Sequence, residues 1–195
     1  MTATVLTPTR RTLADTIPGD WVRDVVLVAG FALLTALAAQ LSVSLWFTPV
    51  PITGQTFAVL LAGGTLGATR GVASQMLYVA LGAIGLPFYA EGEGGWRVAT
   101  GSTAGYLVGF IAAAYVIGLM AERRLDRRVL TAIPAFLVGT IIIYGLGAMW
   151  LQQKLDVPFF GAESAYSFGI EPFVIADVAK AALAGLLLPA GWRLR

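Results

Sequence analysis

The chain of 195 residues contains no cysteine, no histidine and no asparagine. Without cysteine it has no disulfide framework, no thiolate ligand and no thiol nucleophile. Without histidine it has no imidazole to bind a metal or to act as a general base. An enzyme built on this chain would depend on Asp, Glu, Lys, Ser, Thr or Tyr alone. We therefore expect neither a metal site nor a cofactor.

Charged residues are also scarce. They make up 12% of the chain, against 57% hydrophobic residues, and the mean hydropathy is +0.79. A soluble domain of this size carries about twice that share of charge. The formal net charge of +2 is small, and it does not gather into a patch for nucleic acid. The composition predicts a membrane protein.

Apolar runs predict an all-α, polytopic fold with six transmembrane helices. A span needs about 20 residues to cross the hydrocarbon core, or somewhat fewer where the bilayer thins. The six predicted spans are Val25–Val43, Gly54–Thr69, Gly71–Phe88, Gly101–Ala121, Val129–Leu151 and Pro172–Trp192. Only Arg70 separates the second from the third, and Gly67, Arg70 and Gly71 favour a tight turn there over one long kinked helix.

The basic residues predict the orientation, because cytoplasmic loops are enriched in Lys and Arg. With the N-terminus inside, Arg97 and Lys154 would lie outside and Lys180 within a span. Ten arginines would then lie inside: Arg10, Arg11, Arg23, Arg70, Arg123, Arg124, Arg127, Arg128, Arg193 and Arg195. We therefore expect a cytoplasmic tail at residues 1–24 without a cleaved signal, a membrane domain at 25–192 and a cytoplasmic C-terminus at 193–195.

The two longest connections, residues 89–100 and 152–171, both fall on the predicted outer side. They carry acidic residues, and the first also contains Gly92, Gly94 and Gly95, which make it flexible. Such loops suit the capture of a ligand from outside.

The sixth predicted span contains two charges, Asp177 and Lys180. Either charge at the centre of a lone helix costs about 2.5 to 3.5 kcal/mol on insertion scales. Three residues apart, the two side chains share one helical face and can neutralise each other. One interpretation is a structural ion pair that fixes helix packing. We favour a ligand site, because intramembrane ionisable groups usually face a cavity or a substrate path.

Three further features are candidates for the site or for an interface. Gly101, Gly105 and Gly109 recur every fourth residue, and this spacing allows close helix packing, which we favour for Gly109. Gly101 and Gly105 could equally contact a ligand, because hydroxyls, including those of Thr103 and Tyr106, surround them. Thr53, Gln55 and Thr56 follow two prolines at the mouth of the second span, where they either cap that helix or line the entrance to a site. Ala32 and Ala36 form a small-xxx-small pair on the first span, which by itself is weak evidence for a docking surface.

Four stretches of the sequence resemble the BioY family, the biotin-binding S components of energy-coupling factor (ECF) transporters. These stretches are PVPITGQTFAVLLAGGTLGATRG, LYVALGAIGLPFYA, GEGG leading to TGSTAGYLVGF, and ADVAKAAL. The family commonly has Gly-Pro-Thr-Gly-Gly-Tyr where this chain has Gly-Ser-Thr-Ala-Gly-Tyr at residues 101–106.

The resemblance implies a six-helix subunit of the cell membrane that binds biotin near the outer face and has no hydrolytic activity. It also implies pairing with a transmembrane coupling protein and two ATPase subunits through an Ala-x-x-x-Ala motif on helix one, which Ala32 and Ala36 match. Biotin offers two ureido N–H donors, a ureido carbonyl, an apolar ring and chain, and a carboxylate. Asp177 could accept from the ureido group, while either Lys180 or Arg97 could hold a ligand oxygen.

Two rival functions stay open on the sequence. An intramembrane enzyme using Asp177 would lack a second intramembrane carboxylate and a nucleophile motif. An autonomous secondary transporter would usually show paired broken helices in inverted repeats, which this chain does not display.

Overall fold

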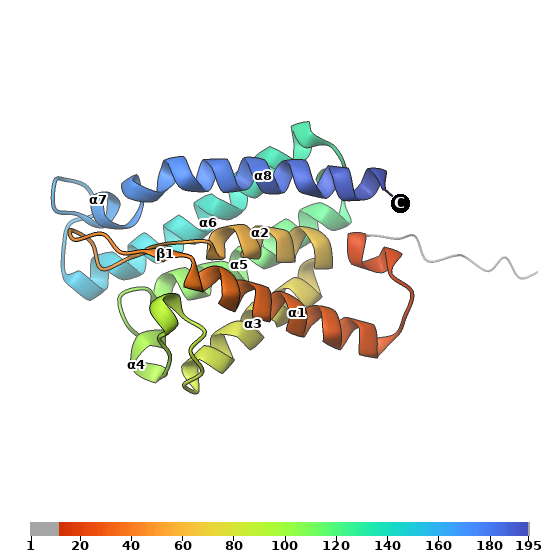
Figure 1. The fold of residues 1–195 in the computed structure, drawn as a ribbon. Helices are drawn as coiled ribbons and strands as arrows, with labels where there is room; N and C mark the ends of the chain where they lie inside the picture. The colour runs from red at the N-terminus through yellow and green to blue at the C-terminus, as the bar shows by residue number, and fades with distance from the viewer. Residues whose placement is uncertain (1–11, 195) are drawn as a thin grey trace, which may run out of the picture.

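The computed structural model describes residues 12–194, which form a helical bundle (Figure 1). Arg10, Arg11 and Arg195, which the orientation argument placed inside, lie outside the described residues. The long helices are α1 (Trp21–Gln40), α2 (Gln55–Leu66), α3 (Ala68–Ala83), α5 (Ala104–Glu122), α6 (Val129–Leu155) and α8 (Val174–Arg193). The short elements are η1 (Leu13–Thr16), β1 (Ser42–Val43), β2 (Ile52–Thr53), η2 (Ala90–Gly92), α4 (Trp96–Ala99), η3 (Leu125–Arg127), α7 (Ala165–Gly169) and η4 (Glu171–Phe173).

Helix α5 lies at the centre of the bundle and packs against α2, α3 and α6. Of its apolar span 61% is buried, against 22% of that of α1. Glycines allow this close packing. A Cβ added at Gly109 would come within 2.9 Å of the Ile143 backbone, and one at Gly118 within 2.3 Å of the Ala68 nitrogen. The contacts of α5 are therefore set by backbone approach, as is usual between helices in lipid.

One end of the bundle is tied together by an ion network around Arg70. Its guanidinium contacts Asp15 at 2.6 Å and Asp24 at 3.0 Å, which fixes η1 beside the starts of α1 and α3. Burial acts to raise the pKa of Asp15, but its hydrogen bonds to Arg70 and Thr12 and the Arg70 charge outweigh burial and lower that pKa. The end of α8 also lies here (Figure 1), and η3 packs against α8, so Arg23, Arg70, Arg193 and the arginines of residues 123–128 lie at one end of the bundle.

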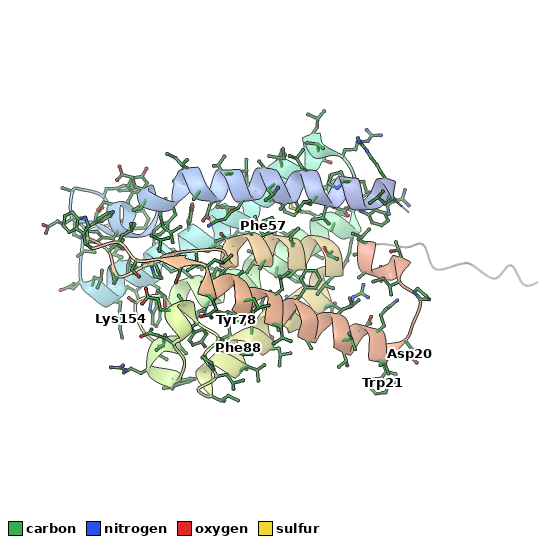
Figure 2. All side chains as sticks on the ribbon, viewed as in Figure 1. Asp20, Trp21, Phe57, Tyr78, Phe88 and Lys154 are labelled. Carbon is green, nitrogen blue, oxygen red and sulfur yellow. The ribbon has the colours of Figure 1, made fainter. Side chains whose placement is uncertain are left out.

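The opposite end carries β1, α4 and α7, short elements that no apolar run predicted (Figure 1). Pro49 and Pro51 cannot continue a helix, and the chain instead makes a two-residue antiparallel ladder in which Ser42 pairs with Thr53. The all-α prediction therefore needs this small correction. Helices α4 and α7 lie at the same end (Figure 1), and Lys154 lies far from Asp20 and Trp21 (Figure 2).

The break between α2 and α3 lies at Gly67, three residues before the predicted boundary at Arg70. Gly67 has φ +84°, a conformation that favours glycine. The Glu122 carboxylate accepts from the Ala68 backbone N–H at 2.9 Å and so caps α3 across the turn. The prediction of a turn was right in kind, but its position was wrong because a carboxylate from α5 supplies the cap.

Other helix ends also differ from the predicted spans. Helix α1 begins at Trp21, where Asp20 accepts from the Val22 N–H at 3.1 Å, so the tail of residues 1–24 includes its first turn. Helix α6 continues to Leu155, and η4 precedes α8.

Within residues 12–194, four helical stretches are long and apolar enough to cross a membrane: Trp21–Gln40, Ala104–Glu122, Val129–Leu155 and Ala165–Arg193. Helix α2, with 12 residues, and α3, with 16, are shorter. At 1.5 Å per residue, α2 rises about 18 Å, well under the thickness of a hydrocarbon core.

Candidate ligand-binding site

A cavity of about 500 Å³ opens at the end of the bundle that carries β1, β2 and α4. Six segments line it: the β1–β2 region, the start of α2, residues 89–103, α5, α6 and the η4–α8 segment. Phe110, Phe173 and Ile143 contribute apolar wall, while Ser44, Thr48 and Thr103 contribute hydroxyls. A volume of this size and a mixed lining are typical of small-molecule sites.

The buried pair in α8 faces this cavity. The Lys180 Nζ lies 2.5 Å from the Asp177 Oδ1, and the Asp177 side chain is 4% exposed against 20% for Lys180. The Thr56 hydroxyl donates to the same Asp177 oxygen at 2.9 Å, and the Tyr144 hydroxyl donates to Oδ2 at 2.8 Å. Asp177 thus holds three donors where a carboxylate has about four acceptor sites, so Oδ2 has room for one more.

The three donors of Lys180 all have acceptors already. Besides Asp177, its ammonium donates to the Thr53 carbonyl at 2.5 Å and to the Thr56 hydroxyl at 3.3 Å. An ammonium has three N–H groups. Lys180 therefore ties α8 to the β2–α2 corner, and a ligand oxygen could bind it only by displacing one of these bonds.

Arg97 is the exposed cation of the cavity. It lies in the last turn of α4, and within residues 12–194 its guanidinium has no hydrogen bond or ion pair. Glu91 and Glu93 line the cavity nearby and are exposed as well; the Ser44 hydroxyl donates to Glu91. A guanidinium with five uncommitted donors can bind a carboxylate with two parallel bonds.

The cavity brings together seven of the eight residues predicted to bind a ligand, namely Gln55, Arg97, Gly101, Thr103, Tyr106, Asp177 and Lys180. Several are already engaged within the fold. The Gln55 amide donates to the Tyr78 hydroxyl, the Trp150 indole donates to the Gly101 carbonyl at 2.8 Å, and the Tyr106 hydroxyl donates to the Gly169 carbonyl at 2.7 Å. These three hydrogen bonds hold neighbouring segments of the chain together and so shape the wall of the cavity.

Gly105 does not line the cavity. A Cβ there would come within 2.3 Å of Trp150 and 2.5 Å of the Leu146 carbonyl, so Gly105 allows α5 to pack on α6. Gly101 precedes α5, which begins at Ala104. The three predicted glycines therefore do not form one helical stripe, because the first lies in the turn that leads into the helix.

Ala32 and Ala36 lie on the inner face of α1, with exposures of 1% and 6%, within the hydrophobic core of this chain. A partner cannot touch them in this arrangement. The expectation that they form an outward surface needs correction: small residues let α1 approach its own bundle, and the same spacing would serve a partner helix.

Tyr144, which the sequence did not single out, and Thr56, which it placed at the mouth of the second span, complete the polar cluster. Tyr144 stands in the apolar run IIIYGLG of α6, and Thr56 is on the first turn of α2; both hydroxyls bond Asp177. A phenol inside a predicted span was the available signal for Tyr144.

At the wall of the cavity, Tyr89 donates to the Val79 carbonyl at 2.8 Å, and burial raises its pKa to about 12, so the phenol stays protonated at neutral pH.

Comparison with known proteins identifies the family. The sequence profile of the BioY family matches residues 6–195. The chain belongs to the BioY family.

Individual BioY relatives cover most of the chain. The probable biotin transporter BioY of Pyrococcus horikoshii is 40% identical over 165 residues, covering 85% of this chain and 93% of the relative. The biotin transporter BioY of Rhizobium etli is 38% identical over 173 residues, covering 85% and 90%. Among solved structures, the S-component for biotin from an ECF-type ABC transporter matches with a TM-score of 0.80 and 26% identity, covering 90% of this chain and 93% of that chain.

Proposed function

We propose that this chain is the biotin-binding subunit of a biotin uptake system. The single observation that carries the assignment is the Asp177–Lys180 pair, which faces a cavity of about 500 Å³ and keeps one carboxylate acceptor free. The relatives carry the name biotin transporter, and BioY is a family of transport components, not of enzymes. The chain binds biotin and releases it unaltered.

The polar groups of the cavity match the two ends of biotin. The free acceptor on Asp177 Oδ2 takes a ureido N–H, and the hydrogen bonds from Tyr144 and Lys180 hold the carboxylate in its orientation. Because the Lys180 donors are all used, Arg97 at the mouth is the partner of the biotin carboxylate. The apolar ring and chain lie between these ends, against Phe110 and Phe173.

The membrane arrangement is part of the proposal. The chain is a multi-pass protein of the cell membrane with six transmembrane helices. Helices α2 and α3 meet at the Gly67 turn, and the bilayer thins locally to accommodate the short helix α2. Its N- and C-termini are cytoplasmic. The support is that Arg23, Arg70 and the arginines of residues 123–128 and 193 belong to one end of the bundle, whereas Lys154 lies at the other (Figure 2).

Transport in this proposal also uses a transmembrane ECF coupling protein and two ATPase subunits, and the support is the likeness to the S-component for biotin from an ECF-type ABC transporter. Helix α1 is the docking helix: Leu33 and Leu37 are 50% and 67% exposed, while the buried Ala32 and Ala36 set how close α1 lies to the bundle. Uptake in a host without coupling subunits would instead indicate an autonomous transporter.

The test measures biotin binding to the purified protein by calorimetry. Wild type should bind one biotin, and Asp177→Asn should bind about ten- to 150-fold more weakly, as for the loss of a charged hydrogen bond worth about 1.5 to 3 kcal/mol. Arg97→Gln should weaken biotin but leave the affinity for biotin methyl ester unchanged, because the ester carries no charge. Lys154→Gln, outside the cavity, is the control.

Unchanged biotin affinity in a folded Asp177→Asn protein would refute the assignment of the site. An equal loss for biotin and its methyl ester in Arg97→Gln would show that Arg97 does not hold the carboxylate.

A further inference from the structure

The end of the bundle opposite the cavity carries a dense group of arginines. Residues 122–128 include four arginines and two acids, and η3 packs against the ends of α5, α6 and α8, which brings Arg193 to the same end. We call Arg123, Arg124, Arg128 and Arg193 the arginine patch. All four are exposed, and within residues 12–194 none has an ion pair.

The two acids near the patch do not neutralise it. Glu122 turns toward the α2–α3 break, where it accepts from the Ala68 N–H at 2.9 Å. Asp126 is 3% exposed and accepts from the Trp192 indole beneath the surface. Arg127 lies over the Trp192 ring, 4.1 Å from its centroid, so the buried acid and this arginine face inward. The four arginines of the patch therefore present a positive charge to the surroundings, and this charge can attract an external anion.

Apolar side chains flank these charges. Leu130, next to Arg128 at the start of α6, is 88% exposed, and Leu194, next to Arg193, is 86% exposed. Arg128 is also the N-cap residue of α6, a 27-residue helix whose first turn receives no side-chain cap. The positive end of that helix adds to the attraction for an anion.

We propose that the arginine patch binds the phosphate headgroup of an anionic phospholipid, with Leu130 and Leu194 against its acyl chains. The combination of exposed arginines and exposed leucines fits a lipid better than a soluble anion, because only the lipid has an apolar part. Basic pockets at the cytoplasmic ends of membrane helices bind such headgroups. The inference rests on the membrane placement proposed above, but not on biotin binding.

The test compares lipid retention by native mass spectrometry after purification from mixed phosphatidylglycerol and phosphatidylcholine nanodiscs. Wild type should retain phosphatidylglycerol in preference to phosphatidylcholine. The triple variant Arg123→Gln/Arg124→Gln/Arg128→Gln should lose most of that preference, at about fivefold per arginine. Arg128→Gln alone should lose about fivefold, and Lys154→Gln, a single charge removed at the other end, should lose none. Raising the salt concentration should weaken the preference.

Undiminished preference in the folded triple variant would overturn the proposal. So would equal competition by glycerol phosphate, which has the headgroup charge without acyl chains and would mark the patch as a site for a soluble anion. Biotin binding, measured on the same samples, should be unchanged in the triple variant. Failure of wild type to bind biotin would reject the proposed function while leaving the lipid result to be judged separately.

Discussion

The buried pair in α8 leads to an asymmetric prediction for stability. The Asp177 side chain is 4% exposed, whereas Lys180 is 20% exposed and borders the cavity. Lys180→Met leaves a carboxylate that water hardly reaches. Asp177→Asn leaves an ammonium that the water of the cavity can solvate and that keeps its bond to the Thr53 carbonyl. We therefore expect Lys180→Met to destabilise the protein more than Asp177→Asn.

The magnitudes follow from these surroundings. Removing one partner of a buried ion pair costs about 3 to 5 kcal/mol, since the other charge is left unpaired. Lys180→Met should fall in this range, because it also leaves the Thr53 carbonyl without its donor. Asp177→Asn should cost about 1 to 2 kcal/mol, near the value of one hydrogen bond. The double variant buries no unpaired charge, so it should be more stable than Lys180→Met alone, although it should not bind biotin.

Unfolding in detergent, followed by intrinsic tryptophan fluorescence without biotin, measures the four proteins of this double-mutant cycle. The chain has five tryptophans, and none is in the pair, so the signal is common to all variants. The reasoning is refuted if the two single variants are equally destabilised, or if the double variant loses the sum of the two single losses. Additivity would mean that the two charges do not stabilise each other.

Two further predictions concern orientation and packing. Because the chain has no native cysteine, a thiol at the exposed Glu163 should react with an impermeant reagent in intact cells and one at the exposed Arg123 should not; the reverse pattern would invert the proposed topology. Gly118→Ala should lower stability by about 1 to 3 kcal/mol, because its Cβ would meet backbone atoms of Ala68 that cannot rotate away. Gly145→Ala, with no atom within 4 Å, should instead gain about 0.5 to 1 kcal/mol in the same unfolding assay. Equal effects of the two substitutions would contradict this packing argument.

The sequence predicted the helical fold well because long apolar runs and short polar breaks report directly on burial in lipid. It located helix ends less well where distant residues decide them. The α2–α3 break depends on Glu122 from α5, and the ladder of β1 and β2 depends on pairing across the eight residues between the two strands. Neither cap nor pairing partner is visible in a local window of sequence.

Site residues could be predicted where the side chain is unfavourable in lipid, and could not be predicted where the side chain is common in membrane helices. Asp177 and Lys180 could be chosen from the sequence because a charge inside a span is energetically costly and is usually retained for a function. Tyr144 and Thr56 complete their hydrogen bonds. Thr56 was a candidate through its place at the mouth of the second span, whereas the Tyr144 hydroxyl lies inside a span, where such a group is too common to mark a site. Gly105 was misplaced for a related reason, since spacing does not tell a glycine that packs a helix from one beside a cavity.

Helix α1 shows the same limit at an interface. In water, the apolar face of a helix marks its buried side. In a bilayer both lipid and protein are apolar, so the hydrophobic pattern no longer tells which face of the helix packs against protein. Ala32 and Ala36 could equally have faced a partner, and the structure places them inside the bundle. The exposed side of α1 presents larger side chains, including Leu33 and Leu37. A coupling protein that docks on α1 must therefore have a surface complementary to the exposed Leu33 and Leu37 side chains. The buried Ala32 and Ala36 would affect docking only indirectly, by setting how closely α1 packs against the bundle.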